Sequence, residues 1–224
     1  MNISTSTGGP TPYYEDTKAG IVIYHGDCRE ILPTLPPVDL VLTDPPYGIA
    51  YSPGGGGAGW ATRTFSGADF VHGDDRPFDP DHLLSFPRVV LWGGNHFANR
   101  LPSSPTWLIW YKRHPNEAPN DFADCEIAWS NVGGPARVFW HEWKGAMRAS
   151  ERGVHYHPTQ KPVALMHWCI SLAGEAETIL DPYMGAGPTL RAAKDLGRKA
   201  IGIEIEERYC EIAAKRLAQE VMAL

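Results

Sequence analysis

The sequence predicts an α/β fold whose centre is a doubly wound, mostly parallel β-sheet. The first observation is the end of the chain, where strand patterns over 177–180 and 199–205 alternate with helical patterns over 188–196 and 206–221. This alternation is typical of parallel strands joined by helical crossovers. The second observation is that other short apolar runs, such as 38–43, pass directly into turn residues, as the strands of a buried sheet do.

The earlier part of the chain contains shorter elements and one long loop. Pro33 and Pro36 end the first predicted helix, because proline cannot continue a helix. Residues 48–81 include a run of glycines and show little periodicity, which predicts a long loop of the kind that is usually functional. The other predicted elements are strands over 20–24, 38–43, 88–92, 106–111, 125–130 and 138–142, and helices over 27–32 and 163–173.

The length of 224 residues and the hydrophobic content of 43% predict one domain over residues 20–224. Residues 1–19 are rich in Ser, Thr, Gly and Pro and are expected to be flexible, and a small recognition insertion is expected between about 112 and 156. No apolar run approaches the roughly 18 to 20 residues of a membrane span, and the N-terminus lacks a secretory pattern. The sequence therefore predicts a cytoplasmic protein with no membrane partner.

The cysteines give no sign of a metal site. No two of them have the two-residue spacing that lets one turn present two thiolates to a metal, so they are expected to be free thiols. A zinc site built from His155, His157 and a distant cysteine is the less favoured alternative. We assign no metal. The four cysteines are Cys28, Cys125, Cys169 and Cys210.

The formal net charge of −6 argues against a protein that coats nucleic acid by charge alone, because nonspecific affinity comes from neutralising phosphates. The distribution of charge is more informative. Basic residues gather in 85–116 and 137–161, while most acids lie elsewhere, a distribution that is compatible with one cationic face on an acidic body, although a basic run is more often a solvated surface. The candidate nucleic-acid contacts are Lys112, Arg113, Lys144, Arg148 and Arg152.

Residues 181–187 form a glycine-containing turn between a predicted strand and a predicted helix. In this position, backbone N–H groups and the helix dipole can receive a polar or anionic cofactor, and Gly185 and Gly187 allow close approach of the backbone. An ordinary tight turn is the alternative for a single Gly-x-Gly. Leu190 stands where a dinucleotide fingerprint has its third glycine, which disfavours an NAD site.

Glu204 ends the next predicted strand, where an acid commonly accepts hydrogen bonds from ribose hydroxyls. This position strengthens the prediction of a cofactor site beyond what the glycine turn indicates. The alternative is that Glu204 caps the helix that begins at Glu206.

The segment 44–47 (Asp-Pro-Pro-Tyr) follows a predicted buried strand without a gap. An exocyclic base amine is conjugated and poorly nucleophilic, so a site that uses it must accept its hydrogens and free the nitrogen lone pair. The Asp44 carboxylate and the Pro45 carbonyl can supply two acceptors, and Tyr47 can stack on a base taken out of the duplex. A proline-rich loop with a chance acid is the alternative.

These two motifs resemble those of a known family. Residues 44–47 look like the Asp-Pro-Pro-Tyr catalytic motif of S-adenosylmethionine-dependent DNA amino-methyltransferases, and 181–187 is similar to their cofactor motif. Segments 26–30 and 157–162 also agree, so the resemblance covers about residues 20 to 220. The catalytic motif precedes the cofactor motif, which resembles the circularly permuted beta class. Tyr183 and Ala186 are slight departures from the usual Phe and Ser.

The resemblance implies a Rossmann-like methyltransferase fold and S-adenosylmethionine as the cofactor. It places the methionine part of the cofactor near the glycine turn and near Thr159 and Lys161, the ribose at Glu204 and the adenine near Asp27. The catalytic residues implied are Asp44, Pro45, Pro46 and Tyr47. The cofactor-binding residues implied are Asp27, Cys28, Thr159, Lys161, Asp181, Pro182, Tyr183, Gly185, Gly187 and Glu204.

The resemblance also implies the reaction, which is methylation of DNA at the N6 amine of adenine. Family members that act on the N4 amine of cytosine more often have Ser in place of Asp44, so cytosine is the first alternative. A catalytically silent nucleotide- or DNA-binding module is the second, and methylation of a protein glutamine would require Asn at position 44. Little chain remains for recognition, so we expect short or relaxed sequence specificity or a homodimer.

Overall fold

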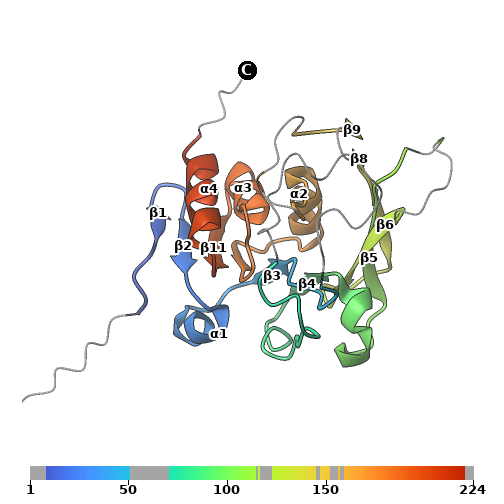
Figure 1. Cartoon of the computed structure of the whole chain (residues 1–224), viewed down its shortest axis with the longest axis horizontal. Helices are drawn as coiled ribbons and strands as arrows, with labels where there is room; N and C mark the ends of the chain where they lie inside the picture. The colour runs from blue at the N-terminus through green and yellow to red at the C-terminus, as the bar shows by residue number, and fades with distance from the viewer. Residues whose placement is uncertain are drawn as a thin grey trace, which may run out of the picture.

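The computed structural model describes residues 9–50, 71–114, 116, 123–144, 147–151, 156 and 159–219. Within these residues the strands form a nine-stranded sheet, with helices packed on both of its faces (Figure 1). The strands are β1 (Tyr14–Asp16), β2 (Ile21–His25), β3 (Leu40–Thr43), β4 (Val89–Trp92), β5 (Thr106–Tyr111), β6 (Cys125–Ser130), β7 (Arg137–Trp140), β8 (Trp143–Lys144), β9 (Met147–Arg148), β10 (Thr178–Asp181) and β11 (Lys199–Glu204). The helices are α1 (Cys28–Ile31), η1 (Leu32–Thr34), η3 (Gly94–Arg100), α2 (Val163–Leu172), α3 (Pro188–Asp195) and α4 (Glu207–Ala218).

The strand order of the sheet is β1-β2-β11-β10-β3-β4-β6-β5-β7. Its central run, β2-β11-β10-β3-β4, is parallel throughout. This run has the doubly wound order 3-2-1-4-5, with β10 and β11 in places 1 and 2 although they come last in the chain. The topology thus confirms the predicted circular permutation. β6 is antiparallel to both β4 and β5.

Alternate residues of the central strands bury opposite faces of the sheet. Leu40 and Leu42 belong to the core cluster that also contains residues of α2, α3 and α4, which lie in a row on one side (Figure 1). Val41 points to the other cluster, which contains Ile31 of α1 and Phe97 of η3. Both faces are therefore removed from water, which explains why these strands read as continuous apolar runs rather than alternating ones.

The switch point of the sheet lies between β10 and β3, where the strand order reverses. The carboxyl ends of these two neighbouring strands are joined by a hydrogen bond of 2.6 Å from Oγ1 of Thr43 to Oδ1 of Asp181. Their other ends are joined through Asp39, whose Oδ2 accepts hydrogen bonds from the backbone N–H and the hydroxyl of Thr178. In doubly wound sheets the ligand site lies at this carboxyl edge.

The structure differs from the sequence prediction at several places. Residues Tyr14–Asp16, expected to be flexible, form β1 because they pair antiparallel with β2. The expected insertion between about 112 and 156 contributes β6 and β7 to the main sheet and the small β8-β9 pair. Of the predicted loop 48–81, residues 51–70 lie outside the described part, and Phe78 is buried in the core. No helix in the described ranges is long and apolar enough to cross a membrane.

Gly202 in β11 allows α3 and the cofactor turn to pack directly on the sheet. A Cβ at this position would lie 2.5 Å from Sδ of Met184 and 2.7 Å from Cδ2 of Leu190, both of which are buried. Gly202→Val is therefore expected to lower the free energy of unfolding by about 1 to 3 kcal/mol, or roughly 2 to 12 °C in melting temperature. Thermal unfolding followed by circular dichroism measures this. The control, Lys199→Val at an exposed position of the same strand, should change the melting temperature little; equal effects would contradict the packing argument.

Candidate active site

Asp44 lies immediately after β3, at the switch point, and both of its carboxylate oxygens accept hydrogen bonds. The Tyr47 hydroxyl donates to Oδ1 at 2.5 Å, and Nζ of Lys161 donates to Oδ2 at 2.5 Å. The Asp44 side chain keeps 18% of its surface exposed, so a ligand can approach it. Burial raises the pKa of Asp44 above its ordinary value, although the charge of Lys161 opposes this. The predicted catalytic segment is therefore a constrained acceptor site.

The loop that carries Asp44 is anchored from outside the motif. Oδ1 of Asp74 accepts hydrogen bonds from the backbone N–H of Gly48 at 2.7 Å and of Ile49 at 3.3 Å. Gly48 has φ +76°, and a Cβ there would lie 2.5 Å from the backbone oxygen of Arg76. Asp74 is itself buried. The sequence analysis missed this anchor, because Asp74 belongs to a segment without periodicity.

The ring of Tyr47 is held by the end of the neighbouring strand β4. A Cβ on Gly93, whose φ is +72°, would lie 2.0 Å from Cε1 of the Tyr47 ring, so only glycine fits there. The exposed His96 stacks on the ring, with centroids 4.8 Å apart and an interplanar angle of 15°. Burial raises the pKa of Tyr47 well above its ordinary value, so the residue stays a neutral phenol. A glycine after the strand that ends at Trp92 was the signal available in the sequence for this contact.

Lys161 lies just before α2 and is buried beside Asp44. Its Nζ lies 3.2 Å from the Tyr47 hydroxyl and 3.1 Å from Oε2 of Glu126, in addition to its bond to Asp44. The resemblance placed Lys161 near the methionine carboxylate; in the structure its ammonium lies between two carboxylates of the catalytic side instead. Those carboxylates raise the pKa of Lys161 well above its ordinary value against the effect of burial, so it stays charged.

Asp181 faces the protein interior and not the open side of the cofactor turn. Its Oδ1 accepts hydrogen bonds from the Thr43 hydroxyl at 2.6 Å and from the backbone N–H of Tyr183 at 3.2 Å, and the residue is only 3% exposed. Burial raises the pKa of Asp181 to about 7. Its observed position is that of a residue that joins the cofactor turn to the catalytic strand, and direct contact with the cofactor stays a prediction.

Both glycines of the turn have a positive φ. Gly185 has φ +50° and Gly187 has φ +74°, in the left-handed region. A Cβ on Gly187 would also lie 2.9 Å from Cβ of Ala213 in α4, so this glycine serves helix packing as well. A residue of α4 also holds the turn in place, because Nη1 of the buried Arg216 donates to the Ala186 carbonyl at 2.6 Å.

Glu204 ends β11, and Asp27 lies two residues after the end of the neighbouring parallel strand β2. The Glu204 carboxylate accepts hydrogen bonds from the backbone N–H of Gly185 at 2.9 Å and of Glu206 at 2.8 Å. Glu206 is the N-cap residue of α4, which has no side-chain cap bond, so Glu204 fixes the chain before the helix rather than capping it; ribose binding stays a prediction. Asp27 is exposed and caps α1 through the backbone N–H of Arg29 at 2.8 Å.

Tyr183 projects from the turn into an aromatic cluster on the α1 side of the sheet. Its hydroxyl lies 3.0 Å from Nε2 of His82, and its ring meets Phe78 edge to face at a centroid distance of 5.6 Å. Cys28, a predicted cofactor residue, is buried here, and burial raises the pKa of its thiol. His82 and Phe78 come from the segment before β4 and were missed, since nothing in the sequence places them near residue 183.

Segment 159–161 is joined to the cofactor turn through Glu151. Oε1 of Glu151 accepts from Nε2 of Gln160 at 3.1 Å and from Nη2 of Arg216 at 3.0 Å. Arg216 also bonds the Ala186 carbonyl, so one buried cation fastens both segments. Thr159 directly precedes Gln160 of this network in the chain. His155 and His157 lie outside the described residues.

The candidate nucleic-acid contacts are mostly engaged within the protein. Arg113 is 5% exposed and paired with Asp124, and Arg148 is 7% exposed with its guanidinium 4.0 Å from the centroid of the Trp143 ring. Both side chains are therefore largely covered by the protein, and contact with phosphates stays a prediction. Lys112 bonds Glu126 at 2.7 Å. Lys144 lies in β8, and Arg152 lies outside the described residues.

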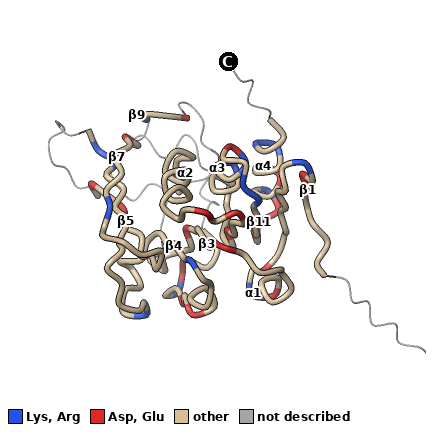
Figure 2. Tube along the Cα trace, turned by 180° about the vertical axis from the view of Figure 1, so that it is seen from behind, with Lys and Arg blue, Asp and Glu red and all other residues tan. Residues whose placement is uncertain are grey.

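The described cations do not gather on one face. In Figure 2, Lys and Arg positions occur beside β5 and β7 at one end of the sheet and around α3, α4 and β1 at the other. Within the part of the chain that the structure describes, this distribution favours the solvated surface over a single cationic face.

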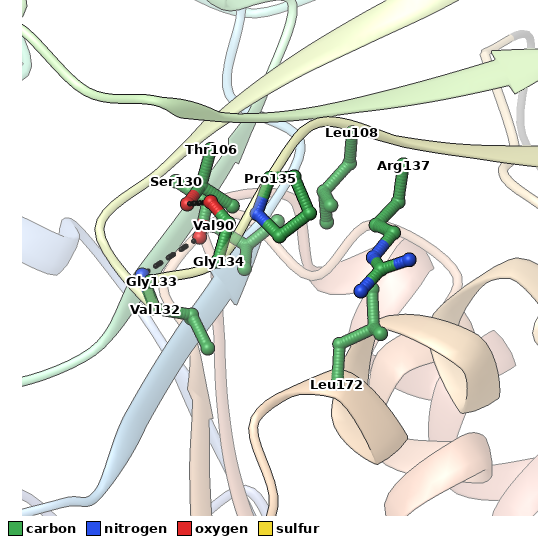
Figure 3. Close-up of a pocket in the computed structure, with 10 residues that line it drawn as sticks. All are labelled: Val90, Thr106, Leu108, Ser130, Val132, Gly133, Gly134, Pro135, Arg137 and Leu172. Carbon is green, nitrogen blue, oxygen red and sulfur yellow. Dashed lines mark hydrogen bonds between the residues drawn. The ribbon is translucent and has the colours of Figure 1, made fainter.

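A separate hollow of about 150 Å³ lies near the start of β5 and the end of β6 (Figure 3). It is lined by Val90, Leu108 and Leu172 with Arg137 at its side. The Thr106 hydroxyl there donates to the Gly134 carbonyl at 2.6 Å. This hollow lies beside the amino ends of β4 and β5, whereas Asp44 follows the carboxyl end of β3, which is parallel to β4, so the hollow is not the candidate active site.

Comparisons with known proteins agree with this geometry. A family model described as "DNA methylase" matches residues 108–215. The type II methyltransferase M2.DpnII of Streptococcus pneumoniae is 44% identical, over 93% of this chain and 93% of that protein. The type II methyltransferase M.HinfI of Haemophilus influenzae is also 44% identical, over 88% of this chain and 68% of that protein.

Solved structures give the same result for the fold. The M1.HpyAVI–SAM complex superimposes with a TM-score of 0.51 and 26% identity, over 88% of this chain and 99% of that one. The cytosine-N4-specific PvuII DNA methyltransferase has a TM-score of 0.61 over 96% of this chain and 92% of that one. At 16% identity the second likeness concerns the fold alone.

The buried Asp181 carboxyl is expected to make stability depend on pH. Because its folded pKa of about 7 lies above its ordinary value of 3.8, the stability it contributes is full below about pH 4 and is lost as pH rises through 7. When the pH is raised from 5 to 8, the melting temperature of Asp181→Asn should therefore fall less than that of the native protein. Differential scanning calorimetry at both pH values tests this, with Glu175→Gln as an exposed control. Equal pH dependence of native and Asn variants would show that Asp181 is ionised in the fold.

Proposed function

The chain belongs to the DNA methyltransferase family, and on that premise we propose that it transfers a methyl group from S-adenosylmethionine to the N6 amine of adenine in DNA. The observation that carries this proposal is the position of Asp44. Its carboxylate stands at the switch point of the sheet, partly exposed, one strand away from the glycine turn. The carboxyl edge of the sheet therefore holds both an acceptor for an amine and a turn suited to a methyl donor.

The residues of segment 44–47 act on the acceptor base. When bound, S-adenosylmethionine supplies a methyl group on a sulfonium, which is already a good leaving group. The ionised Asp44 and the Pro45 carbonyl accept the two amine hydrogens, which frees the nitrogen lone pair for in-line attack. Tyr47, fixed against Gly93, holds the flipped base by stacking. Asp44 must be ionised to accept, so activity falls as the pH drops through its raised pKa.

The residues at the carboxyl edge fit such a cofactor by the chemistry of their donor and acceptor groups. Glu204 is partly exposed, and each of its oxygens accepts one backbone N–H. A carboxylate oxygen has a second lone pair, so Glu204 can accept ribose hydroxyls without giving up these bonds. The exposed Asp27 carboxylate on the adjoining strand end is available to the adenine part.

Adenine is favoured over cytosine because Asp44, not Ser, stands at the acceptor position. The intact motifs and the ordered acceptor network disfavour a silent binding module. A homodimer, a cytoplasmic location and short sequence specificity stay predictions. Nucleoside mass spectrometry of DNA after incubation with the protein and the methyl donor distinguishes N6-methyladenine from N4-methylcytosine and tests the target directly.

Asp44→Ala is expected to lower kcat by about 100-fold or more, since the main acceptor for the amine is removed. Affinity for S-adenosylmethionine should stay within a few-fold, because Asp44 acts on the acceptor. Transfer of tritiated methyl groups to unmethylated genomic DNA measures turnover, and calorimetry measures affinity. The control is Asp75→Ala, which removes an exposed acid outside segment 44–47 and should leave turnover unchanged. Near-normal turnover of Asp44→Ala would remove Asp44 from the reaction.

Glu204→Ala is expected to weaken S-adenosylmethionine binding by about 10- to 100-fold, because ribose hydroxyls lose a charged acceptor worth about 1.5 to 3 kcal/mol. Isothermal titration calorimetry with the full chain measures this. Glu207→Ala, an exposed acid in the first turn of α4, is the matched control and should bind normally. Unchanged affinity in Glu204→Ala would place the ribose elsewhere.

A further inference from the structure

The acceptor site described above is closed by its own protein neighbours. Oδ1 of Asp44 already accepts a bond from Tyr47, and Oδ2 already accepts one from Lys161, each at 2.5 Å. A base amine that enters can use the second lone pair of either oxygen, and Asp44 accepts it more strongly once the positive charge of Lys161 has moved away. The Lys161 ammonium has three N–H donors, and the Glu126 carboxylate lies within its reach. Lys161 is therefore the neighbour that can exchange its bond to Asp44 for a bond to another carboxylate.

Glu126 is that second carboxylate, and one of its oxygens is available. Lys112 donates to Oε1 at 2.7 Å, which fixes the side chain. Oε2 lies 3.1 Å from Nζ of Lys161, yet within the described residues it is buried and accepts no hydrogen bond. A buried carboxylate oxygen that lacks a donor is costly, so it should readily take one. Lys161 needs only a small rotation to supply it.

We propose that Glu126 is a positioning residue of the methyl-transfer site, which takes the Lys161 ammonium from Asp44 when the target base enters. This proposal rests on the proposed function. In the free protein, Lys161 shares its charge between the two carboxylates and bonds Asp44. With the base amine at Asp44, Lys161 bonds Oε2 of Glu126, and Lys112 keeps the Glu126 side chain in place.

The charges around Asp44 allow this exchange without a change in net charge. The titratable groups around Asp44 come from several elements. Tyr47 lies on the same loop, and His96 in η3 stacks on it. The others are Lys161 before α2, Glu126 in β6, Lys112 after β5 and Asp181 at the end of β10. Although burial raises it, the two lysines hold the pKa of Glu126 at about 2, so Glu126 is always ionised. Its negative charge raises the pKa of Asp44, and Lys161 lowers it.

Glu126→Gln tests the proposal in the full-length protein, with tritiated S-adenosylmethionine and unmethylated genomic DNA. Without the second carboxylate, Lys161 stays on Asp44, and kcat should fall about tenfold while KM for DNA changes less than about twofold. The acid limb of the pH profile of kcat should move to lower pH, because a negative neighbour that raises the pKa of Asp44 is gone. A purely structural role would lower the melting temperature without moving that limb.

Two further variants separate reach from charge. Glu126→Asp keeps the charge but shortens the side chain, so kcat should fall while the acid limb stays in place. Asp124→Asn, two residues earlier in the chain and paired with Arg113, should change neither quantity. In a Lys161→Met background, Glu126→Gln should change kcat less than about twofold, since Glu126 acts through Lys161.

The results distinguish this inference from the proposed function. Loss of activity in Asp44→Ala together with unchanged kcat and an unmoved acid limb in Glu126→Gln would overturn the role of Glu126 alone. Activity in Asp44→Ala would overturn the proposed function and this role with it. Independent, multiplicative effects of Glu126→Gln and Lys161→Met would show that Glu126 does not act through Lys161. If Glu126→Gln does not fold, Glu126→Asp decides by its kcat.

Discussion

The hydrogen bond between Thr43 and Asp181 joins the two strands on either side of the switch point, and the arrangement of the site depends on it. Thr43 is the last residue before Asp44, and Asp181 is the first residue of the glycine turn. Because both are buried and the distance is 2.6 Å, the acceptor loop and the turn cannot shift independently. The in-line geometry that methyl transfer requires is therefore set by the interior of the sheet and not by the loops themselves.

Around this bond lie two networks of buried and partly buried charges. Asp44, Lys161, Glu126 and Lys112 form one chain of ion pairs. Glu151 and Arg216 form another, beneath the cofactor turn. Buried ion pairs contribute little net stability, because desolvation offsets the attraction, but breaking one leaves an uncompensated charge. Their effect here is to define single positions for segments 44–50 and 159–161, which have little regular secondary structure of their own.

Circular permutation changes the order of the motifs along the chain and leaves their spatial relation intact. The strands in places 1 and 2 of the sheet are the last two in the sequence, yet they bring the glycine turn and Glu204 to the same edge as Asp44. The region between β4 and α2 does not form a separate recognition domain in the described residues; β6 and β7 extend the sheet, and Glu126 of β6 reaches the acceptor site. Sheet extension and site construction thus use the same strand.

The amino-acid sequence by itself determined the elements and the two motifs, since both are local. Continuous apolar runs located the central strands, and Pro33 and Pro36 ended the first helix. Segments 44–47 and 181–187 are contiguous, so no long-range information was needed to find them. The tertiary structure decided the partners. Lys161 meets Asp44 across 117 positions of sequence, and Thr43 meets Asp181 across 138. Which charge a buried side chain faces depends on strand order and on desolvation, and neither leaves a periodic signal in the sequence. For this reason Glu126, Gly93 and His96 emerged only from the structure, and Arg113 and Arg148 proved to be buried.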